Sequence, residues 1–506
     1  MTPAERRART LERLASQRFD LLVVGAGIIG SRIAYDAARA GMSVALIDAG
    51  DFGCATSSSS SKFIHGGLRY LTMGSVRLVR AAQAERATLL RSVAPQLVHP
   101  MPMVLVVRRG EHAAATLRAG LLVYGALSAR GEARARLLTL GEAQTFVPPI
   151  ASDDVHACAL LPEGQTNDAR LTLATVTKAE HAGAAVANYV ALEDCLHASG
   201  QVGGAVLRIR EERLELRCRG VVNATGPWVD RIRQLEDSAA APIARLSKGA
   251  HALLPLPAAW RAGIVVHGRD DRTTFAVPWH GMLLVGTTDT PYDAQPAHVR
   301  AEARDLDALL GQAESVLGPE LVQRDCVQFS FAGLRVLPRG NGDTARARRD
   351  HLISVGRHGV VSVAGGKLTL HRRIAVDALR ALPPELRPRT LAAEPQQQTR
   401  ALPRELDPTL RMHLLSTYGL AAGEVLEGWR EDPDALEPIR AGAPDVWAQV
   451  WYAAEREWAL EPEDVARRRT TLAIRGRLDG SLRAELAHAL TYANRAPSYL
   501  SIRNPL

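Results

Sequence analysis

FDLLVVGAGIIGSRIAYDAARAGMSVALID, residues 19–48, is the stretch of the chain that decides its fold. An apolar run over residues 19–24 leads into a glycine-rich turn, and an alanine-rich stretch with helical spacing follows as far as Ala40. A second apolar run, residues 44–47, ends in Asp48. This order of strand, glycine turn, helix, strand and acid predicts a βαβ unit.

The glycines of the turn, Gly25, Gly27 and Gly30, have the G-x-G-x-x-G spacing of dinucleotide-binding folds. Gly25 permits the tight turn, Gly27 lets the backbone approach a pyrophosphate, and Gly30 lets the helix pack closely on the strand. The phosphates would sit on unpaired N–H groups at the helix N-terminus. Asp48 is placed to accept hydrogen bonds from a ribose hydroxyl, and its charge would repel the 2′-phosphate of NADP.

The composition sets limits on the class of protein. The chain has 506 residues, 46% of them apolar, which is enough for two or three domains with cores. No run approaches the roughly 18 uncharged apolar residues of a membrane-spanning helix, so any membrane contact is expected to be peripheral. Residues 1–20 carry five arginines and no apolar segment, so we expect no secretory signal and a cytoplasmic protein.

The net charge of +8 suits an anionic substrate, an anionic cofactor or an acidic lipid surface. The arginines are scattered along the chain and no nucleic-acid-binding motif occurs, which argues against a nucleic-acid partner. The five cysteines lie far apart, without the spacing of metal ligands, so neither a disulfide framework nor a metal site is predicted.

Lysine is rare in this arginine-rich chain. Only Lys62, Lys178, Lys248 and Lys367 occur, and three of the four lie in segments rich in glycine, serine or histidine. A lysine kept under such a bias can mark a place where a compact ammonium cannot be replaced by a planar guanidinium.

Further motifs follow the βαβ unit in a fixed order. They are ATSSSSSKFIHGGLRYL (55–71), VVNATGPW (221–228), SKGAH (247–251), FAVPW (275–279), GTTD (286–289), AGLRVL (332–337), SVAGGKLTLHR (362–372) and EREWALEPEDVARRRTTL (455–472). With these motifs the chain closely resembles, over roughly residues 19–490, the membrane-associated, quinone-linked FAD-dependent glycerol-3-phosphate dehydrogenase family.

The resemblance implies that sn-glycerol 3-phosphate is oxidised to dihydroxyacetone phosphate by hydride transfer to FAD, with a membrane quinone as the electron acceptor. It also implies a homodimer that associates peripherally with the inner face of the cytoplasmic membrane. The family's Tyr-Ser-Gly-Val-Arg-Pro segment is Phe-Ala-Gly-Leu-Arg-Val here, at residues 331–336. The arginine is kept and hydroxyls are lost, so we expect hydrogen bonding to the substrate to differ while charge recognition is retained.

The implied architecture is α/β. We expect a Rossmann-like FAD-binding domain that is discontinuous in sequence, at residues 1–84, 158–228 and 346–385. A mixed-sheet substrate-binding domain would comprise residues 85–157 and 229–345, and an all-α C-terminal domain residues 400–506. In that last domain Trp447, Trp451 and Trp458 could line a membrane interface, but the neighbouring glutamates favour core packing.

Oxidation of a secondary alcohol needs a hydride acceptor, a base for the hydroxyl proton and anchors for the substrate. Motif matches give Arg335, Lys367 and Arg69 as cationic anchors for a phosphate, because guanidinium groups bind phosphate oxygens bidentately. His251 is the preferred base, with His65 as the competing choice, because imidazole titrates near working pH. Tyr70 would orient the hydroxyl or form the pocket wall.

Hydroxyls and amides of the serine run would line the flavin pyrophosphate, and the Gly365-Gly366-Lys367 loop would present helix N-terminal amides to the flavin edge. The predicted cofactor-binding residues are Gly25, Gly27, Gly30, Asp48, Thr56, Ser57, Ser58, Ser61, Lys62, His65, Ala224, Gly226, Gly365, Gly366, Lys367, Leu368 and Thr369.

Two other functions stay open on the sequence. A related FAD-dependent amine or 2-hydroxy-acid oxidoreductase would share the βαβ unit, but it would pair an arginine with a carboxylate in place of a phosphate-binding cluster. A non-catalytic flavin- or lipid-binding regulator would lack the complete set of Arg335, Lys367 and His251, and this chain has all three.

Overall fold

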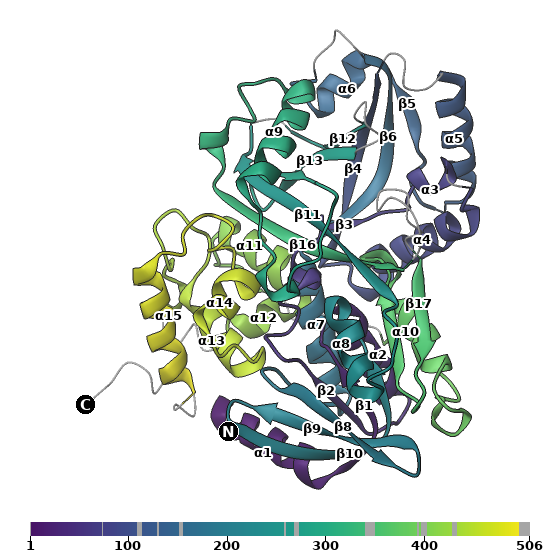
Figure 1. Cartoon of the computed structure of the whole chain (residues 1–506). Coiled ribbons are helices and arrows are strands. Elements are labelled where there is room, and N and C mark those ends of the chain that lie inside the picture. Colours follow the sequence, from purple (N-terminus) through teal and green to yellow (C-terminus); the bar gives the residue numbers. More distant parts are fainter. Residues whose placement is uncertain are drawn as a thin grey trace.

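The computed structural model describes residues 2–72, 74–108, 114–128, 131–150, 155–257, 260–267, 273–339, 350–391, 394–395, 402–427 and 433–494. Two sheets and a group of C-terminal helices make up these residues (Figure 1). The arrangement confirms the expected α/β class with a helical C-terminal domain.

The first sheet carries the βαβ unit. Its strand order is β17-β18-β10-β1-β2-β7, with β1 parallel to both β10 and β2. Its strands are β1 (Arg18–Val24), β2 (Val44–Ile47), β7 (Ala185–Ala187), β8 (Ala191–Ala198), β9 (Gln201–Ile209), β10 (Glu212–Asn223), β17 (His351–Val355) and β18 (Val361–Gly365). The β1 strand is buried from Leu21 to Val24, as a central parallel strand must be.

The second sheet lies above the first in Figure 1. Its long strands β11 and β16 are antiparallel and pair over ten residues, from Ala244 opposite Pro338 to Leu253 opposite Phe329. Its strands are β3 (Phe63–Ile64), β4 (Val98–Arg108), β5 (Arg136–Leu138), β6 (Val155–Thr166), β11 (Ala244–Pro255), β12 (Gly263–His267), β13 (Thr273–Trp279), β14 (Met282–Gly286), β15 (Thr290–Pro291) and β16 (Phe329–Pro338).

The sheets divide the chain differently from the expected domain boundaries at one place. Strand β3 pairs with β6, with Phe63 opposite Gln165, and both strands belong to the second sheet. We had expected residues 1–84 and the part of β6 beyond residue 158 to lie in the FAD-binding domain. Short-range pattern does not show which sheet a two-residue strand joins, because its partner lies about a hundred residues away.

Helices cover both sheets. Helices α2, α7 and α10 share one buried core with the central strands of the first sheet. The helices of the two-sheet part are α1 (Pro3–Ser16), α2 (Ile28–Arg39), α3 (Arg69–Thr72), α4 (Val76–Thr88), α5 (Ala114–Ala126), α6 (Leu140–Phe146), α7 (Asp168–His181), α8 (Val229–Glu236), α9 (Ala303–Leu317) and α10 (His371–Arg380).

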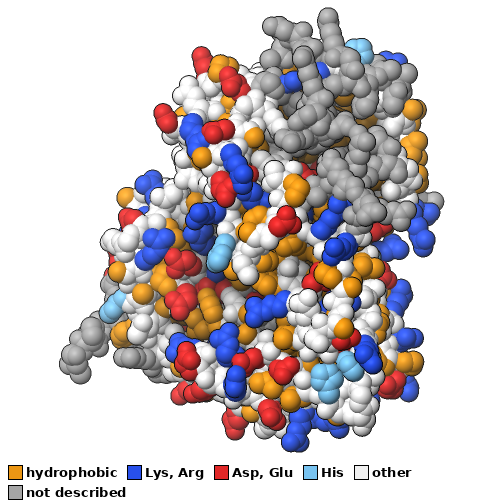
Figure 2. Space-filling view, viewed as in Figure 1, with side chains coloured by type: hydrophobic (Ala, Val, Ile, Leu, Met, Phe, Trp, Pro, Cys, Tyr) orange, Lys and Arg blue, Asp and Glu red, His pale blue; other side chains and the backbone are white. Residues whose placement is uncertain are grey.

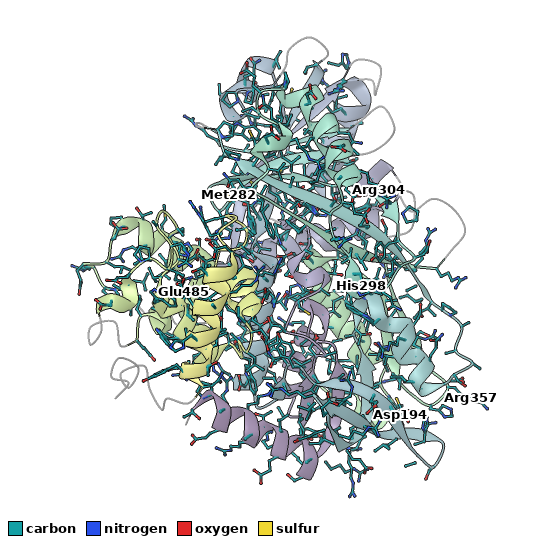
Figure 3. The ribbon with its side chains drawn as sticks, turned by 60° about the vertical axis from the view of Figure 1, so that its left-hand side comes forward. Asp194, Met282, His298, Arg304, Arg357 and Glu485 are labelled. Atoms are coloured by element: carbon teal, nitrogen blue, oxygen red, sulfur yellow. The ribbon has the colours of Figure 1, made fainter. Side chains whose placement is uncertain are left out.

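The C-terminal domain is helical in its described residues and packs at the left of the molecule in Figure 1. Figure 3 shows Glu485 in this domain, apart from Asp194 at the lower sheet and Met282 at the upper one. The helices are α11 (Pro408–Tyr418), α12 (Ala422–Val425), α13 (Trp447–Arg456), α14 (Pro462–Asp464) and α15 (Gly480–Ala493).

The tryptophans confirm the core-packing interpretation. Trp447 and Trp451 pack partly buried against the core of the C-terminal domain. Trp458 lies beyond the end of α13, where it has a φ of 60° and packs edge-to-face on Phe52 with 6.4 Å between ring centroids. The three rings therefore do not lie on one face of a single helix. Among the described residues, no helix is both long and apolar enough to cross a membrane.

Candidate active site

The glycine turn joins β1 to α2 with no room for side chains. Gly25 has a φ of 97°, a conformation that favours glycine. A Cβ atom on Gly30 would lie 1.9 Å from the Gly25 carbonyl oxygen. Gly27 is the N-cap of α2, and the Ile28 N–H donates to the Ser57 hydroxyl at 3.0 Å. This close-packed turn at a helix N-terminus fits the pyrophosphate of a dinucleotide.

Asp48 follows β2 and faces the same turn. Its Oδ2 accepts a hydrogen bond from the Ala26 N–H at 2.7 Å, and its Oδ1 accepts one from the Gly50 N–H at 3.0 Å. Burial raises the pKa of Asp48 to about 6, and the two amide donors oppose that rise. Each carboxylate oxygen has two lone pairs, so Asp48 retains acceptor capacity for a ribose hydroxyl.

Residues 49–62, which we call the cofactor loop, run from β2 to the second sheet. The loop packs against β16, because the Thr56 hydroxyl donates to the Leu334 carbonyl at 2.7 Å. At Gly333 of the same strand, a Cβ atom would lie 2.4 Å from the Ser59 carbonyl oxygen. With Ser57 bonded to the start of α2, the loop lies between the glycine turn and β16.

Lys62 is the last residue of the cofactor loop, and its side chain points into the protein. Its ammonium donates to the Asp168 carboxylate at 2.6 Å and to the Ser58 carbonyl at 2.7 Å, and the side chain is buried. The predicted cofactor contact of Lys62 stays a prediction. Asp168 was not singled out in the sequence, because a lone acid at a helix start has many structural uses.

His251 lies on β11 in a buried aromatic setting. Its ring stacks on Phe331 with 4.8 Å between centroids and 11° between planes, and its Nε2 lies 3.1 Å from the Ser61 hydroxyl. Burial, and then the positive charges of Arg335 and Lys62, hold the pKa of His251 well below its ordinary value of 6.5. The imidazole is therefore neutral at pH 7 and can accept a proton.

Arg335 is fixed on β16, the strand antiparallel to β11. Its Nη1 donates to the Thr288 carbonyl at 3.0 Å and its Nη2 to the Thr287 hydroxyl at 2.8 Å. The guanidinium lies over Gly249, where a Cβ atom would come within 2.4 Å of Nη2. Asp289 contributes a longer ion pair at 3.8 Å. The side chain keeps 23% of its surface exposed, so it can still reach an anion.

Lys367 lies at a second group of predicted residues. Its ammonium is 3.2 Å from the centroid of the Tyr70 ring, which fits a cation–π contact. The His65 ring stacks on Tyr70 at 6.4 Å, and the His65 N–H donates to the Thr369 hydroxyl at 3.1 Å. Residues 61–65 therefore connect this group to the His251 group. Arg69 begins helix α3, but its side chain lies outside the described part of the structure.

The Gly365-Gly366 turn brings the last motif against the rest of the site. Both glycines have positive φ, 78° and 105°. A Cβ atom on Gly365 would lie 3.2 Å from the carbonyl oxygen of Val336, the neighbour of Arg335. One on Gly366 would lie 3.4 Å from the Ile29 side chain at the start of α2. The turn thus links β16 to the dinucleotide unit, and Leu368 follows it in a short 3₁₀ turn that precedes α10.

Ala224 and Gly226 lie beside the first glycine turn. A Cβ atom on Gly25 would come within 2.7 Å of the Ala224 carbonyl oxygen, and Gly226 has a φ of 57°. Ser58 donates to the Ala55 carbonyl at 3.3 Å within the cofactor loop. The predicted cofactor residues therefore surround the C-terminal ends of β1 and β10, where ligands bind in open α/β sheets.

The remaining lysines have structural partners. Lys248 is buried and donates to Asp305 at 2.7 Å and Glu302 at 3.2 Å. Lys178 donates to the Val93 carbonyl at 3.2 Å, and burial lowers its pKa to about 8. Two of the four lysines, Lys62 and Lys248, are therefore buried with carboxylate partners, and only Lys367 is among the predicted anchors.

Three contributors to the site were not assigned roles from the sequence. They are Asp168 beneath the cofactor loop, Phe331 on the His251 ring, and the Thr287-Thr288-Asp289 segment that holds Arg335. The last belongs to the GTTD motif, which was recognised without a role. The sequence does not show this contact, because about 46 residues separate Asp289 from Arg335. The pairing of β11 with both β14 and β16 brings the two together.

Comparison with protein families identifies two matching domains. Residues 20–372 match the model of the FAD dependent oxidoreductase family, and residues 367–490 match the C-terminal domain of alpha-glycerophosphate oxidase. The two matches overlap at residues 367–372 and together span most of the chain.

Relatives cover nearly the whole sequence. The chain is 33% identical over 490 residues to glycerol-3-phosphate dehydrogenase of Mycobacterium leprae, a match that covers 93% of this chain and 84% of that protein. It is 31% identical over 515 residues to the human mitochondrial glycerol-3-phosphate dehydrogenase, covering 93% of this chain and 70% of that protein.

Solved structures show the same fold. Glycerol-3-phosphate dehydrogenase from Bacillus halodurans, complexed with FAD, superposes with a TM-score of 0.74 at 27% identity and covers 97% of this chain and 92% of that one. The L-alpha-glycerophosphate oxidase of Mycoplasma pneumoniae shares the fold at 17% identity, with a TM-score of 0.60 over 74% of this chain and 98% of that one.

Proposed function

Since this chain belongs to the FAD-dependent glycerol-3-phosphate dehydrogenase family, we propose that it oxidises sn-glycerol 3-phosphate to dihydroxyacetone phosphate. The hydride would pass to FAD, and a membrane quinone would take up the electrons. The observation that carries this proposal is the neighbouring placement of a neutral, buried His251 and the Arg335 guanidinium on paired strands of one sheet.

His251 is the proposed base. Removal of the hydride from C2 leaves a hydroxyl proton that must be accepted, and a neutral imidazole nitrogen can accept it. The bond to Ser61 and the stack on Phe331 fix the orientation of the ring. His65 is less suited, because its ring packs against Tyr70 beside Lys367.

Arg335 and Lys367 are the proposed phosphate anchors. The Arg335 guanidinium is held by the Thr287 hydroxyl and the Thr288 carbonyl, and Asp289 lies 3.8 Å away. Its side chain keeps 23% of its surface exposed, so the guanidinium can still reach an anion. The ammonium of Lys367 lies over the Tyr70 ring, and this cation–π contact positions it. Two such cations suit a phosphate dianion better than the single carboxylate of an amino or 2-hydroxy acid.

FAD fits the residues at the glycine turn. The close contact of Gly30 with Gly25, the N-cap position of Gly27 and the acceptor Asp48 together form the site that a dinucleotide requires. When bound, FAD supplies the hydride acceptor of the reaction.

Removal of Arg335 tests the proposal. Arg335→Ala should lower kcat/KM for sn-glycerol 3-phosphate by about 30-fold or more, because a desolvated phosphate loses a charged partner. Activity with glycerol, which has no phosphate, should change far less. Arg304→Ala is the matched control, because this arginine of the same sheet domain is 81% exposed and is labelled in Figure 3. Equal losses with both substrates would contradict the assignment of Arg335.

We also propose peripheral contact with the inner face of the cytoplasmic membrane. Helices α4 and α5 support it, because they expose the apolar side chains Val76, Leu122 and Val123. The exposed Arg77, Arg80 and Arg118 lie on the same two helices. Figure 2 shows hydrophobic side chains along the upper right edge, where α5 lies in Figure 1, with Lys and Arg side chains below them. Apolar residues flanked by arginine favour an interface with anionic lipid.

The quinone acceptor and the homodimer remain proposals that rest on the family. An assay of the purified protein with sn-glycerol 3-phosphate, with and without a quinone analogue, tests the acceptor. Oxygen consumption that is independent of quinone would contradict it. Sedimentation analysis in detergent tests the dimer, and a monomer with full activity would contradict that proposal.

A further inference from the structure

We infer that the C-terminal helical domain holds the cofactor loop in its FAD-binding position, through the buried contact of Asp51 with Arg468 and Arg469. The inference rests on the proposed FAD binding and adds a role for a domain that supplies none of the proposed catalytic groups. Arg468 and Arg469 would be positioning residues for FAD.

Asp51 lies at the start of the cofactor loop, three residues after Asp48, and is 2% exposed. Its carboxylate accepts hydrogen bonds from Arg468 Nε and Arg469 Nη1, and from Arg469 Nη2 at 2.9 Å. Both arginines end the π-helical turn Val465–Arg469 of the C-terminal domain. The two contact partners are about 418 residues apart in the sequence, so the contact joins two domains.

The charges in this contact are balanced. Asp464 accepts from Arg468 Nη2 at 2.8 Å and from the Tyr189 hydroxyl at 2.7 Å. Two carboxylates thus face two guanidinium groups in a buried space. Burial alone would raise the pKa of Asp51, but Arg469 and Arg468 outweigh burial and hold that pKa below its ordinary value. If the domains separated, Asp51 would lose both of its guanidinium partners, whereas Arg468 would keep Asp464. The position of the loop therefore depends on the docked C-terminal domain.

The other end of the loop is tied to the same domain through α7. Asp168 accepts from the Ser60 N–H at 2.9 Å and from Lys62. Two residues further along this helix, Arg170 forms a bidentate pair with Glu457 of the C-terminal domain, at 2.7 and 2.5 Å. Both ends of the cofactor loop thus depend on contacts that lead to the C-terminal domain.

The N-terminal helix α1 supports the same junction. Arg7 donates to the Asn188 side-chain oxygen at 3.0 Å and to its carbonyl at 2.9 Å. Asn188 in turn donates to Asp51 at 3.2 Å and to the Trp458 carbonyl at 2.8 Å. The arginine-rich N-terminal segment is therefore linked to Asp51 through Asn188.

The link from Asp51 to the pyrophosphate site is short. Two residues beyond Asp51, the Gly53 N–H donates to the Ala26 carbonyl of the glycine turn at 3.1 Å. Further along the loop, the Ser57 hydroxyl accepts a hydrogen bond from the Ile28 N–H at the start of α2. A displaced Asp51 would therefore shift groups that touch the proposed FAD site directly, and linkage requires that FAD binding in turn stabilises the docked domain.

The test uses the full-length protein and FAD itself as the probe. The double variant Asp51→Asn, Arg469→Gln removes one charge of each sign. The matched control is Arg440→Gln, Glu485→Gln, which removes a bidentate pair at 2.8 Å that lies wholly within the C-terminal domain (Glu485 in Figure 3). FAD affinity is measured by titration of the apoprotein. The protein is then heated. Flavin release is monitored by fluorescence and unfolding by circular dichroism, and the two temperatures are compared.

We expect the double variant to bind FAD about 10-fold more weakly and to release it below its unfolding temperature. The control should bind FAD as the unaltered protein does and release it only on unfolding. Unchanged FAD affinity in the double variant, with release only on unfolding, would overturn the inference. Absence of FAD binding by the unaltered protein would overturn the proposed function instead.

Hydrogen exchange of the unaltered protein provides a measurement that needs no variant, in case the double variant does not fold. FAD binding should increase the protection of residues 464–472 in the C-terminal domain as well as that of the cofactor loop. Protection confined to residues 20–62 would show that the two domains are not coupled, and the inference would fail.

Discussion

The surroundings of His251 keep its imidazole neutral at pH 7. On the sequence His251 competed with His65, because either imidazole could titrate near working pH. In the structure His251 is buried, and burial and the charge of Arg335 lower its pKa. The choice of His251 over His65 as the base stays a prediction. Phe331, which replaces the family's tyrosine, provides the flat apolar surface on which the imidazole stacks.

Replacement of His251 tests its role as the base. His251→Gln should lower kcat by about 10²–10⁴-fold, the usual contribution of a general base, with FAD still bound. His197→Gln is the control, because this histidine lies on β8, away from the site. Because the neutral imidazole is the active form and its pKa is lowered, kcat of the unaltered protein should fall only when the pH drops below 6.5. An acid limb at 7 or higher, or near-normal turnover of His251→Gln, would assign the base elsewhere.

The junction of β1 with α2 determines whether the dinucleotide site forms at all. Parallel pairing of β1 with β10 and β2 brings the turn to the carboxyl edge of the sheet. The glycines there are required for different reasons: Gly25 for its backbone conformation, and Gly30 for the contact with the Gly25 carbonyl.

Substitution of two helical glycines separates packing from helix propensity. Gly30→Ala in α2 and Gly311→Ala in α9 both gain about 0.5–1 kcal/mol of intrinsic helix stability. Gly311 has open space around its Cβ position, so its variant should show a higher free energy of unfolding. For Gly30→Ala the free energy of unfolding should instead fall by about 1–3 kcal/mol, and most of the FAD affinity should be lost, because the Cβ atom would overlap the Gly25 carbonyl in the turn. Denaturant titration and flavin content measure both, and an equally stable, fully yellow Gly30→Ala protein would contradict the packing argument.

At the scale of the whole molecule, the two sheets and the helical domain meet around the cofactor loop, and α4 and α5 lie on the outer edge of the second sheet (Figure 1). The inner side of α5 is anchored, because the Tyr124 hydroxyl donates to Glu163 at 2.5 Å and Glu163 also accepts the Gly66 N–H. The same helix exposes Leu122 and Val123. The proposed membrane surface therefore lies on a helix that also supports the motif containing Tyr70.

Two exposed apolar residues provide a matched test of this surface. Leu122 on α5 is 75% exposed, and Met412 on α11 is 73% exposed. Leu122→Glu should reduce binding to vesicles that contain anionic lipid by about 10-fold or more. The change removes an apolar contact with the lipid and adds a negative charge that anionic lipid repels. Met412→Glu should bind normally, and both variants should keep the original melting temperature.

Salt dependence accompanies this test. Binding of the unaltered protein should weaken at high ionic strength, because the Debye length is about 8 Å at physiological salt and shorter above it. Equal vesicle binding of the Leu122 and Met412 variants would move the membrane surface to another part of the molecule.

The sequence alone determined the βαβ unit and the family, because these depend on local apolar periodicity and glycine spacing over a few tens of residues. It also determined which residue types could bind a phosphate and accept a proton. The roles of individual residues within the site remain predictions.

Only the tertiary structure decided which charges meet. Lys62 pairs with Asp168 across 106 residues, and Asp51 pairs with Arg469 across 418. Strand β3 joins the second sheet, and Trp458 packs on Phe52 instead of extending a helix face. The physical reason is the same in each case: the sign of a charge or the size of a ring limits the possible partners, but only the packing of distant elements selects one of them.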